Sequence, residues 1–284
     1  MKSVLLPDGT ALPALGLGTW RVGEWAASRQ AEVAALRHAI SLGYRLFDTA
    51  EMYGEGGAES VLGEALRGAM AAGEVTREEL FVVSKVYPHH ADRRAAVEAC
   101  ARSLARLGLE WLDLYLLHWR GPVRLAETVR AFEALREDGR IRRWGVSNFD
   151  VPDMKALSQV AGGGACVVNQ VWYSASQRAV EFDLLPLQRA QGIPLMAYSP
   201  IDQSALAHHD TLAQVGRRIG ATAAQVALAW TLRDGGVVAI PKALVKSHLR
   251  DNLQAASLTL DAADLALIDR AFPPPRRRRA LAMN

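Results

Sequence analysis

The sequence predicts an α/β fold, and within that class a closed (β/α)8 barrel of the TIM type. Short apolar stretches alternate with helical stretches eight times along the 284 residues. The stretches expected to be strands are apolar on both faces, as buried parallel strands are. After the first pair, no two strands are joined by a two-residue turn. Such barrels average about 250 residues as one unit, so we expect one domain over residues 1–284. An open doubly wound sheet is the alternative.

Local signals support each element in turn. Asp8 and Gly9 lie between two extended runs and predict an N-terminal β-hairpin of residues 4–6 and 10–12. Glycines mark several helix ends, as at Gly43, Gly108 and Gly139. The expected barrel strands are residues 16–20, 44–47, 80–84, 111–117, 143–146, 166–169, 195–197 and 237–240. The expected helices are residues 28–42, 58–66, 92–107, 125–137, 152–160, 181–190, 211–219 and 223–232, with extra C-terminal helices at 247–255 and 262–272.

Composition excludes several other classes of protein. Half of the residues are apolar and 22% are charged, which is typical of a globular protein. The net charge of +3 is too small to indicate nucleic-acid binding. Two cysteines are too few for a secreted disulfide framework, and we find neither a signal peptide nor an apolar run of about 18 residues. We therefore expect a cytoplasmic protein without a membrane, nucleic-acid or obligate protein partner. Residues 273–284, rich in proline and arginine, are expected to form a surface tail.

Polar or aromatic residues follow every expected barrel strand. In such barrels the active site lies at the C-terminal ends of the strands. An acid, a lysine and an imidazole on one rim would be costly to bury without partners, which favours a functional site over a purely structural barrel. The residues that leave the strands are Trp20, Asp48, Lys85, His118, Ser147 with Asn148, Gln170, Tyr198 with Ser199, and Lys242.

Three of these side chains, together with Tyr53, predict a group of residues that delivers a proton. Asp48, Lys85 and His118 follow three successive strands, and Tyr53 comes five residues after Asp48. A lysine cation beside a phenol stabilises the phenolate and lowers the pKa of the phenol. Asp48 would keep Lys85 charged, and His118 offers an N–H to a substrate carbonyl. Each residue alone is more often structural, but the four together favour catalysis. Three aromatic side chains are expected to line the substrate pocket, namely Trp20, Tyr87 and Trp119.

Several other kinds of site are not supported. The glycines near residue 16 lack the third glycine of a dinucleotide-binding turn, and neither a P-loop nor a hydrolase nucleophile elbow is present. The adjacent histidine pairs at 89–90 and 208–209 lack partners at metal spacing, so no metal is expected.

Barrels often bind phosphate after strands seven and eight. Lys242 and the helix that begins near Ser247 could supply that site, and the alternative is an ordinary solvated loop.

On these residues the chain resembles the aldo-keto reductases over nearly its whole length. The matching stretches are residues 15–20, 47–54, 83–86, 112–119, 145–149, 169–170, 197–200 and 240–242. The resemblance implies a barrel of the bacterial type that reduces aldehydes or ketones, with NADPH preferred and NADH as an alternative. It implies Asp48, Tyr53, Lys85 and His118 as the catalytic tetrad, with Tyr53 as the acid. The cofactor-binding residues that it implies are Thr19, Trp20, Ser147, Asn148, Gln170, Tyr198, Ser199, Pro200, Ile201, Lys242, Ala243, His248 and Asn252.

The sequence departs from the family pattern in two places. Ala243 stands where NADPH-preferring members usually have serine, and His248 stands where they have arginine. An imidazole is largely neutral at pH 7, so we expect a weaker and pH-dependent grip on the 2′-phosphate. The short C-terminal segment suggests broad substrate selectivity. Two other functions stay open: an aldolase that forms a Schiff base at Lys85 or Lys242, and a non-catalytic subunit that binds cofactor.

Overall fold

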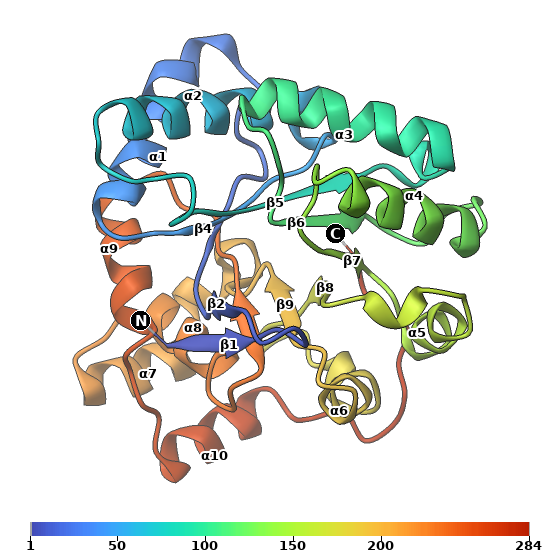
Figure 1. Cartoon of the computed structure of the whole chain (residues 1–284). Coiled ribbons are helices and arrows are strands. Elements are labelled where there is room, and N and C mark those ends of the chain that lie inside the picture. Colours follow the sequence, from blue (N-terminus) through green and yellow to red (C-terminus); the bar gives the residue numbers. More distant parts are fainter. Residues whose placement is uncertain (1, 284) are drawn as a thin grey trace.

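The computed structural model describes residues 2–283, and its centre is a closed barrel of parallel strands (Figure 1). Leu15 forms a parallel bridge with Ala239, and the Gly16 N–H donates to the Ala239 carbonyl at 2.9 Å, which joins the first barrel strand to the last. The barrel is therefore confirmed, and the open sheet is wrong. In spatial order the strands are β3 (Leu17–Gly18), β4 (Leu46–Asp48), β5 (Phe81–Val86), β6 (Leu114–Leu117), β7 (Trp144–Ser147), β8 (Asn169–Trp172), β9 (Leu195–Tyr198) and β10 (Val237–Ala239).

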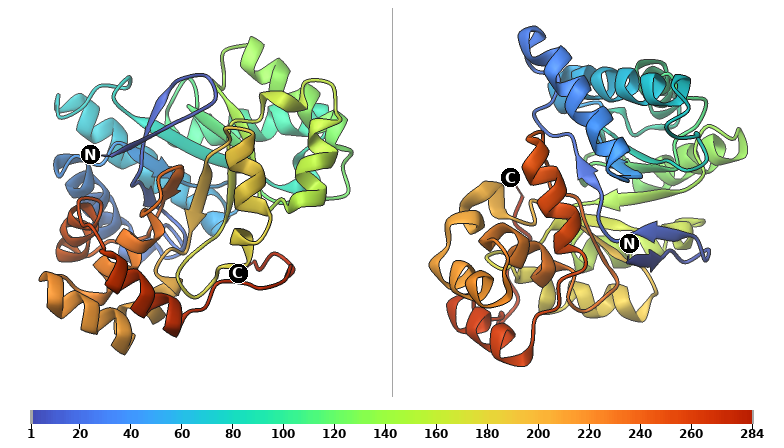
Figure 2. Two further views of the ribbon diagram at one scale, coloured as in Figure 1. Left: turned by 90° about the horizontal axis from the view of Figure 1, so that it is seen from below. Right: turned by 90° about the vertical axis from the view of Figure 1, so that its left-hand side faces the viewer.

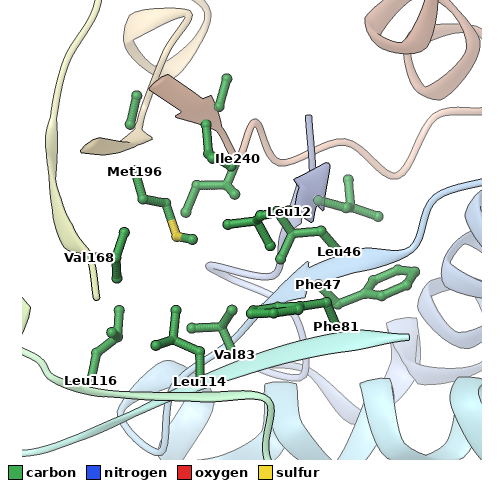
Figure 3. Packing of buried hydrophobic residues seen from close by; sticks show 14 of the residues in the cluster. Leu12, Leu46, Phe47, Phe81, Val83, Leu114, Leu116, Val168, Met196 and Ile240 are labelled. Atoms are coloured by element: carbon green, nitrogen blue, oxygen red, sulfur yellow. The ribbon is translucent and has the colours of Figure 1, made fainter. Parts of the chain in front are cut away.

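The N-terminal hairpin is also confirmed. β1 (Ser3–Leu5) pairs antiparallel with β2 (Ala11–Pro13). The turn between them uses Gly9 at a φ of 83°, a left-handed conformation that glycine adopts without strain. Leu12 of the hairpin is fully buried in the same apolar cluster as Leu46 (Figure 3).

Helices surround the barrel on its outside (Figure 2). They are α1 (Arg29–Ser41), α2 (Gly57–Ala71), α3 (Arg93–Leu107), α4 (Leu125–Glu137), α5 (Val151–Ser158), α6 (Leu184–Ala190), α7 (Asp210–Ile219) and α8 (Ala223–Thr231), with the expected extra helices α9 (Lys246–Ala255) and α10 (Ala262–Ala271). Short 3-10 turns complete the connections: η1 (Ala26–Ser28), η2 (Tyr53–Gly56), η3 (Pro88–His90), η4 (Gly163–Ala165), η5 (Ala179–Glu181) and η6 (Asp202–His208).

Strand boundaries differ most from expectation in β8. This strand begins at Asn169, where residues 166–169 were expected, so Gln170 lies inside the strand opposite Ser147. Cys166 and Val167 are buried, which explains the error, because an apolar stretch reports burial and not strand pairing. In the same way β5 extends to Val86, so Lys85 is a strand residue.

The barrel interior is a packed apolar core. Figure 3 shows Leu46, Leu114, Leu116, Val168 and Met196 within one cluster, and all five are fully buried. Each such side chain stabilises the fold by about 1.5–3 kcal/mol relative to its exposure to water. This core holds the strand ends in fixed relative positions, so polar residues at the rim meet with defined geometry.

The segment after α10 does not simply extend into solvent. It is largely exposed, but it passes α6 and α5 and returns toward the strands near β7 (Figure 1). Arg278 lies 3.2 Å from a carboxylate oxygen of Asp150 and 3.3 Å from one of Asp183. Leu281 packs against the apolar cluster. The surface tail expected over residues 273–284 stays a prediction. Its described part makes these contacts, and its last residue, 284, lies outside the described residues.

Candidate active site

A cavity of about 530 Å³ opens among the residues that end the strands. The predicted site residues that line it come from seven of the eight strand ends and the adjoining loops. They are Trp20, Asp48, Tyr53, His118, Trp119, Ser147, Asn148, Gln170, Tyr198, Ser199, Pro200, Ile201 and Lys242. The other predicted site residues lie around the cavity without lining it: Thr19, Lys85, Tyr87, Ala243, His248 and Asn252.

Lys85 lies beneath the cavity floor and connects the Asp48 carboxylate with the Tyr53 phenol. Its ammonium is fully buried and donates to the Asp48 carboxylate at 2.7 Å and to the Tyr53 hydroxyl at 3.1 Å. A third bond of 2.9 Å goes to the Thr49 carbonyl. All three donors of the ammonium are therefore used, so it cannot rotate away from the phenol without breaking hydrogen bonds.

The electrostatics of Tyr53 correct one expectation. Burial raises the pKa of the Tyr53 phenol above its usual value of 10.0, Lys85 lowers it, and Asp48 raises it again. Lys85 lowers the pKa of the phenol as expected, but burial raises it by more, so the net shift of the pKa is upward. Burial lowers the pKa of Lys85, but Asp48 and Tyr53 raise it to a net value above 10.5. At neutral pH the site therefore holds a protonated phenol beside a charged ammonium.

His118 is a neutral imidazole at the cavity wall. Burial, followed by the positive charge of Lys85, lowers the pKa of His118 well below 6.5. Its ring lies edge-on to that of Tyr53, with centroids 5.7 Å apart. The buried Nδ1 makes no hydrogen bond to any of the described residues. A proton on Nδ1 would bury an unpaired donor, so we assign the proton to Nε2.

Asn148 organises a second group of polar side chains beside His118. It has a left-handed backbone, with φ at 59°, and its side-chain nitrogen donates to the His118 carbonyl at 3.1 Å. The Tyr198 hydroxyl donates to the Asn148 side-chain oxygen at 3.0 Å. Gln170 donates to Asp48 at 2.8 Å. The polar residues of β8, of β9 and of the loop after β7 are thus connected to the catalytic candidates, a link that the sequence did not indicate.

The lining suits a long ligand with an amide at one end and phosphates at the other. Ser147, Asn148 and Gln170 offer amide and hydroxyl groups, and the exposed cation Lys242 lines the cavity after β10. These features fit a nicotinamide dinucleotide. Sequence reasoning missed eight residues that also line the cavity: Gly18, Arg21, Met52, Gln203, Ser204, Ile240, Pro241 and Met283. Met52 is adjacent to Tyr53, which was a usable signal, whereas nothing local marks Met283.

Four predicted residues surround this region without facing the cavity. Thr19 is buried, and its hydroxyl donates to the Asp48 carbonyl at 3.0 Å. Ala243 is buried after β10, and Asn252 is buried in α9. His248 is exposed near the start of α9.

Tyr87 is not part of the cavity wall, in contrast to the sequence prediction. Its ring packs edge-on against Trp119 with a centroid distance of 6.1 Å, and its hydroxyl donates to Glu55 at 3.3 Å. These contacts hold the ring beside Trp119, so Tyr87 supports the wall but does not line it.

Two other kinds of site are not found in the described part of the chain. Among residues 2–283, no group of three or more histidine, cysteine, aspartate or glutamate side chains is arranged to hold a metal ion. None of the helices in the described part of the chain is long and apolar enough to span a bilayer.

Comparison with known proteins decides the family. A sequence profile described as "Aldo/keto reductase family" matches residues 14–272. The chain belongs to the aldo-keto reductase family. It is 46% identical to methylglyoxal reductase YeaE of Escherichia coli K12, with 99% of each chain covered. It is 35% identical to glyoxal reductase of Bacillus subtilis, over 94% of this chain and 91% of that protein.

Solved structures agree with this assignment. An aldo/keto reductase from Klebsiella pneumoniae, in complex with NADP and acetate, is 47% identical and superimposes with a TM-score of 0.94 over 100% of this chain and 99% of that one. A second structure from that organism contains NADPH, with the same identity, TM-score and coverage. Our aldo-keto reductase is an NADPH-dependent oxidoreductase that acts on carbonyl groups, as the resemblance implied. Nothing in these findings supports an aldolase or a non-catalytic subunit.

Proposed function

We propose that this reductase converts small α-oxoaldehydes such as methylglyoxal to hydroxycarbonyl products, with Tyr53 as the general acid. The observation that carries the proposal is the 3.1 Å hydrogen bond from the Lys85 ammonium to the Tyr53 hydroxyl at a cavity also lined by His118. The full-length similarity to a methylglyoxal reductase supports the substrate class.

The reduced nicotinamide supplies a hydride to the carbonyl carbon when it is bound. Tyr53 gives its phenolic proton to the carbonyl oxygen. Lys85, already bonded to the phenol oxygen, stabilises the negative charge that remains there, and Asp48 holds the ammonium in place. A positioned general acid contributes about 10²–10⁴ in rate.

His118 orients the substrate in this proposal. Its neutral ring donates the Nε2–H to the carbonyl oxygen, and a ring that stays uncharged does not compete with Tyr53 as the acid. The side chains of Trp20, Met52 and Trp119 line the same cavity and limit access of water to the reacting carbonyl.

The cofactor residues are assigned in the same proposal. Ser147, Asn148 and Gln170 hold the carboxamide, and Tyr198 stacks against the nicotinamide ring. Thr19 and Trp20 lie at the reactive end. The remaining contacts, toward the phosphates and the adenosine, are assigned to Ser199, Pro200, Ile201, Lys242, Ala243, His248 and Asn252.

We further propose that the enzyme works in the cytoplasm without an obligate partner. The small net charge of +3 and the presence of only two cysteines support this setting.

The experiment measures NADPH consumption with methylglyoxal, glyoxal, benzaldehyde and acetone. Tyr53→Phe should lower kcat by at least about 10²-fold and leave the NADPH dissociation constant within about twofold. Tyr115→Phe is the matched control, because the Tyr115 hydroxyl is buried without a hydrogen-bond partner among the described residues and lies in β6 against Phe132 of α4. It should retain full activity.

Near-normal turnover by Tyr53→Phe would overturn the assignment of the acid. No NADPH consumption with any of these carbonyls would overturn the substrate class. A substrate trapped on the wild-type chain by borohydride would instead favour Schiff-base chemistry at a lysine.

A further inference from the structure

Glu51 is a buried carboxylate in the loop that carries Tyr53, but it does not line the cavity. Its side chain is only 5% exposed. One oxygen accepts the backbone N–H of Tyr87 at 2.8 Å and lies 3.1 Å from His90 Nδ1. The other oxygen lies 3.7 Å from Arg102 of α3. A single carboxylate therefore ties the loop after β4 to the loop after β5.

The loop that Glu51 anchors has a strained backbone. Gly54, Glu55 and Gly56 all have left-handed conformations, with φ values of 57°, 50° and 86°. This region is unfavourable for Glu55 because its Cβ crowds the backbone. The conformation therefore needs support from outside the loop. Part of that support comes from the Glu51 N–H, which donates to the Lys85 carbonyl at 3.3 Å.

The loop after β5 in turn packs against the loop after β6. A Cβ on Gly121 would lie 2.3 Å from the Cβ of Pro88, so the Gly121 backbone packs directly against the Pro88 side chain. The Tyr87 ring meets Trp119 edge-on at 6.1 Å. On its other side Trp119 lines the cavity, with its ring 4.9 Å from that of His118. Glu51 and Trp119 are thus the two ends of one series of contacts.

Burial of a carboxylate is costly unless it is paired, so the position of Glu51 needs an explanation. We propose that Glu51 is a positioning residue that sets the aromatic wall of the substrate cavity by holding the Tyr87 loop behind Trp119. The proposal rests on the proposed function, because it takes the cavity beside Tyr53 as the substrate site. In this proposal Glu51 controls which α-oxoaldehydes fit the cavity, and it does not contact the reacting atoms.

The test compares methylglyoxal with phenylglyoxal. The two substrates share the reacting group, but the first carries a methyl group where the second carries a phenyl ring. In Glu51→Ala the Tyr87 loop loses its anchor, so KM for phenylglyoxal should rise about tenfold, as loss of a hydrogen bond to a charged group allows. KM for methylglyoxal and both kcat values should stay within about twofold. Glu51→Gln keeps an oxygen that can accept the Tyr87 N–H, so it should restore most of the phenylglyoxal KM.

Two further variants separate positioning from a general loss of stability. Glu98→Ala removes an exposed carboxylate that pairs with Arg94 on α3, and it should change neither KM. Glu51→Ala combined with Trp119→Ala should show the same phenylglyoxal KM as Trp119→Ala alone, because Glu51 acts through that ring. Equal losses for both substrates, or fully additive effects with Trp119→Ala, would overturn the proposal.

Hydrogen–deuterium exchange gives a readout that does not depend on activity. Glu51→Ala should accelerate exchange in residues 85–91 at least about tenfold, while residues 93–107 of α3 stay unchanged. Unchanged exchange in 85–91 would overturn the role of Glu51 whatever the kinetics show. If exchange is faster but the wild-type enzyme reduces neither α-oxoaldehyde, the proposed function is refuted. The role of Glu51 in substrate choice is then refuted as well, and only its contact with the Tyr87 loop is established.

Discussion

The side-chain amide of Gln170 donates a hydrogen bond of 2.8 Å to Asp48. The second oxygen of the same carboxylate accepts from Lys85 at 2.7 Å. Gln170 belongs to β8 and Lys85 to β5, so Asp48 connects opposite parts of the barrel rim. The groups proposed to hold the carboxamide and the groups proposed to deliver the proton therefore share one carboxylate.

Replacement of Gln170 by alanine should weaken both catalysis and NADPH binding. One oxygen of Asp48 loses its donor, so kcat should fall about tenfold, and the NADPH dissociation constant should rise by a similar factor. Steady-state kinetics and a fluorescence titration with NADPH measure the two effects. Gln225→Ala, which removes a buried amide in α8, is the control and should affect stability alone. A change in only one of the two quantities would argue against the shared role of Asp48.

Lys85→Met should separate stability from catalysis. It leaves the buried Asp48 carboxylate without its cation, so urea unfolding should show a loss of about 3–5 kcal/mol. Because Lys85 lowers the Tyr53 pKa, its removal raises that pKa further, and kcat should fall at least about 10²-fold. Asp48→Asn with Lys85→Met should recover much of the stability but no activity. Recovery of turnover in that double variant would contradict the proposed role of the ammonium.

His118 should make the fold less stable in acid. Its pKa is lowered well below 6.5 in the folded protein, so the neutral form is favoured there. Below about pH 6.5 the unfolded chain binds a proton that the folded chain does not, and stability falls by up to about 1.4 kcal/mol per pH unit until the folded-state pKa is reached. Above that window the contribution is constant.

Urea unfolding of the wild type and of His118→Gln at about pH 7 and about pH 5 measures this contribution. The wild type should lose more free energy of unfolding between the two conditions than the variant. Identical pH dependence in the two proteins would contradict a neutral buried imidazole.

His248 should set how strongly the enzyme prefers NADPH over NADH. It is exposed near the N-terminus of α9, where helix N–H groups also favour a phosphate. An arginine is always charged and can bind a phosphate through two N–H groups, so His248→Arg should raise the ratio of kcat/KM for NADPH to that for NADH. Steady-state kinetics with both cofactors measures this ratio, and an unchanged ratio in the variant would rule out the role.

The sequence allowed side chains to be placed where their location depends on position along a strand. Asp48, Lys85 and His118 could be placed together because parallel strands end at one rim. Tyr87 could not be placed in this way, because the direction of a side chain just before the turn Pro88–His90 depends on packing against Trp119. Met283 could not be found, because the segment that carries it is held near the cavity by contacts such as that of Arg278 with Asp150, which lies more than a hundred positions earlier in the chain.

The sequence by itself determined the barrel, its order of elements and the identity of the side chains at the rim, since alternation and strand ends are local properties. Only the tertiary structure decided that burial outweighs Lys85 in setting the Tyr53 pKa, that Gln170 meets Asp48, and that Glu51 supports Trp119 through the Tyr87 loop. These results depend on desolvation and on contacts between loops that no local pattern encodes.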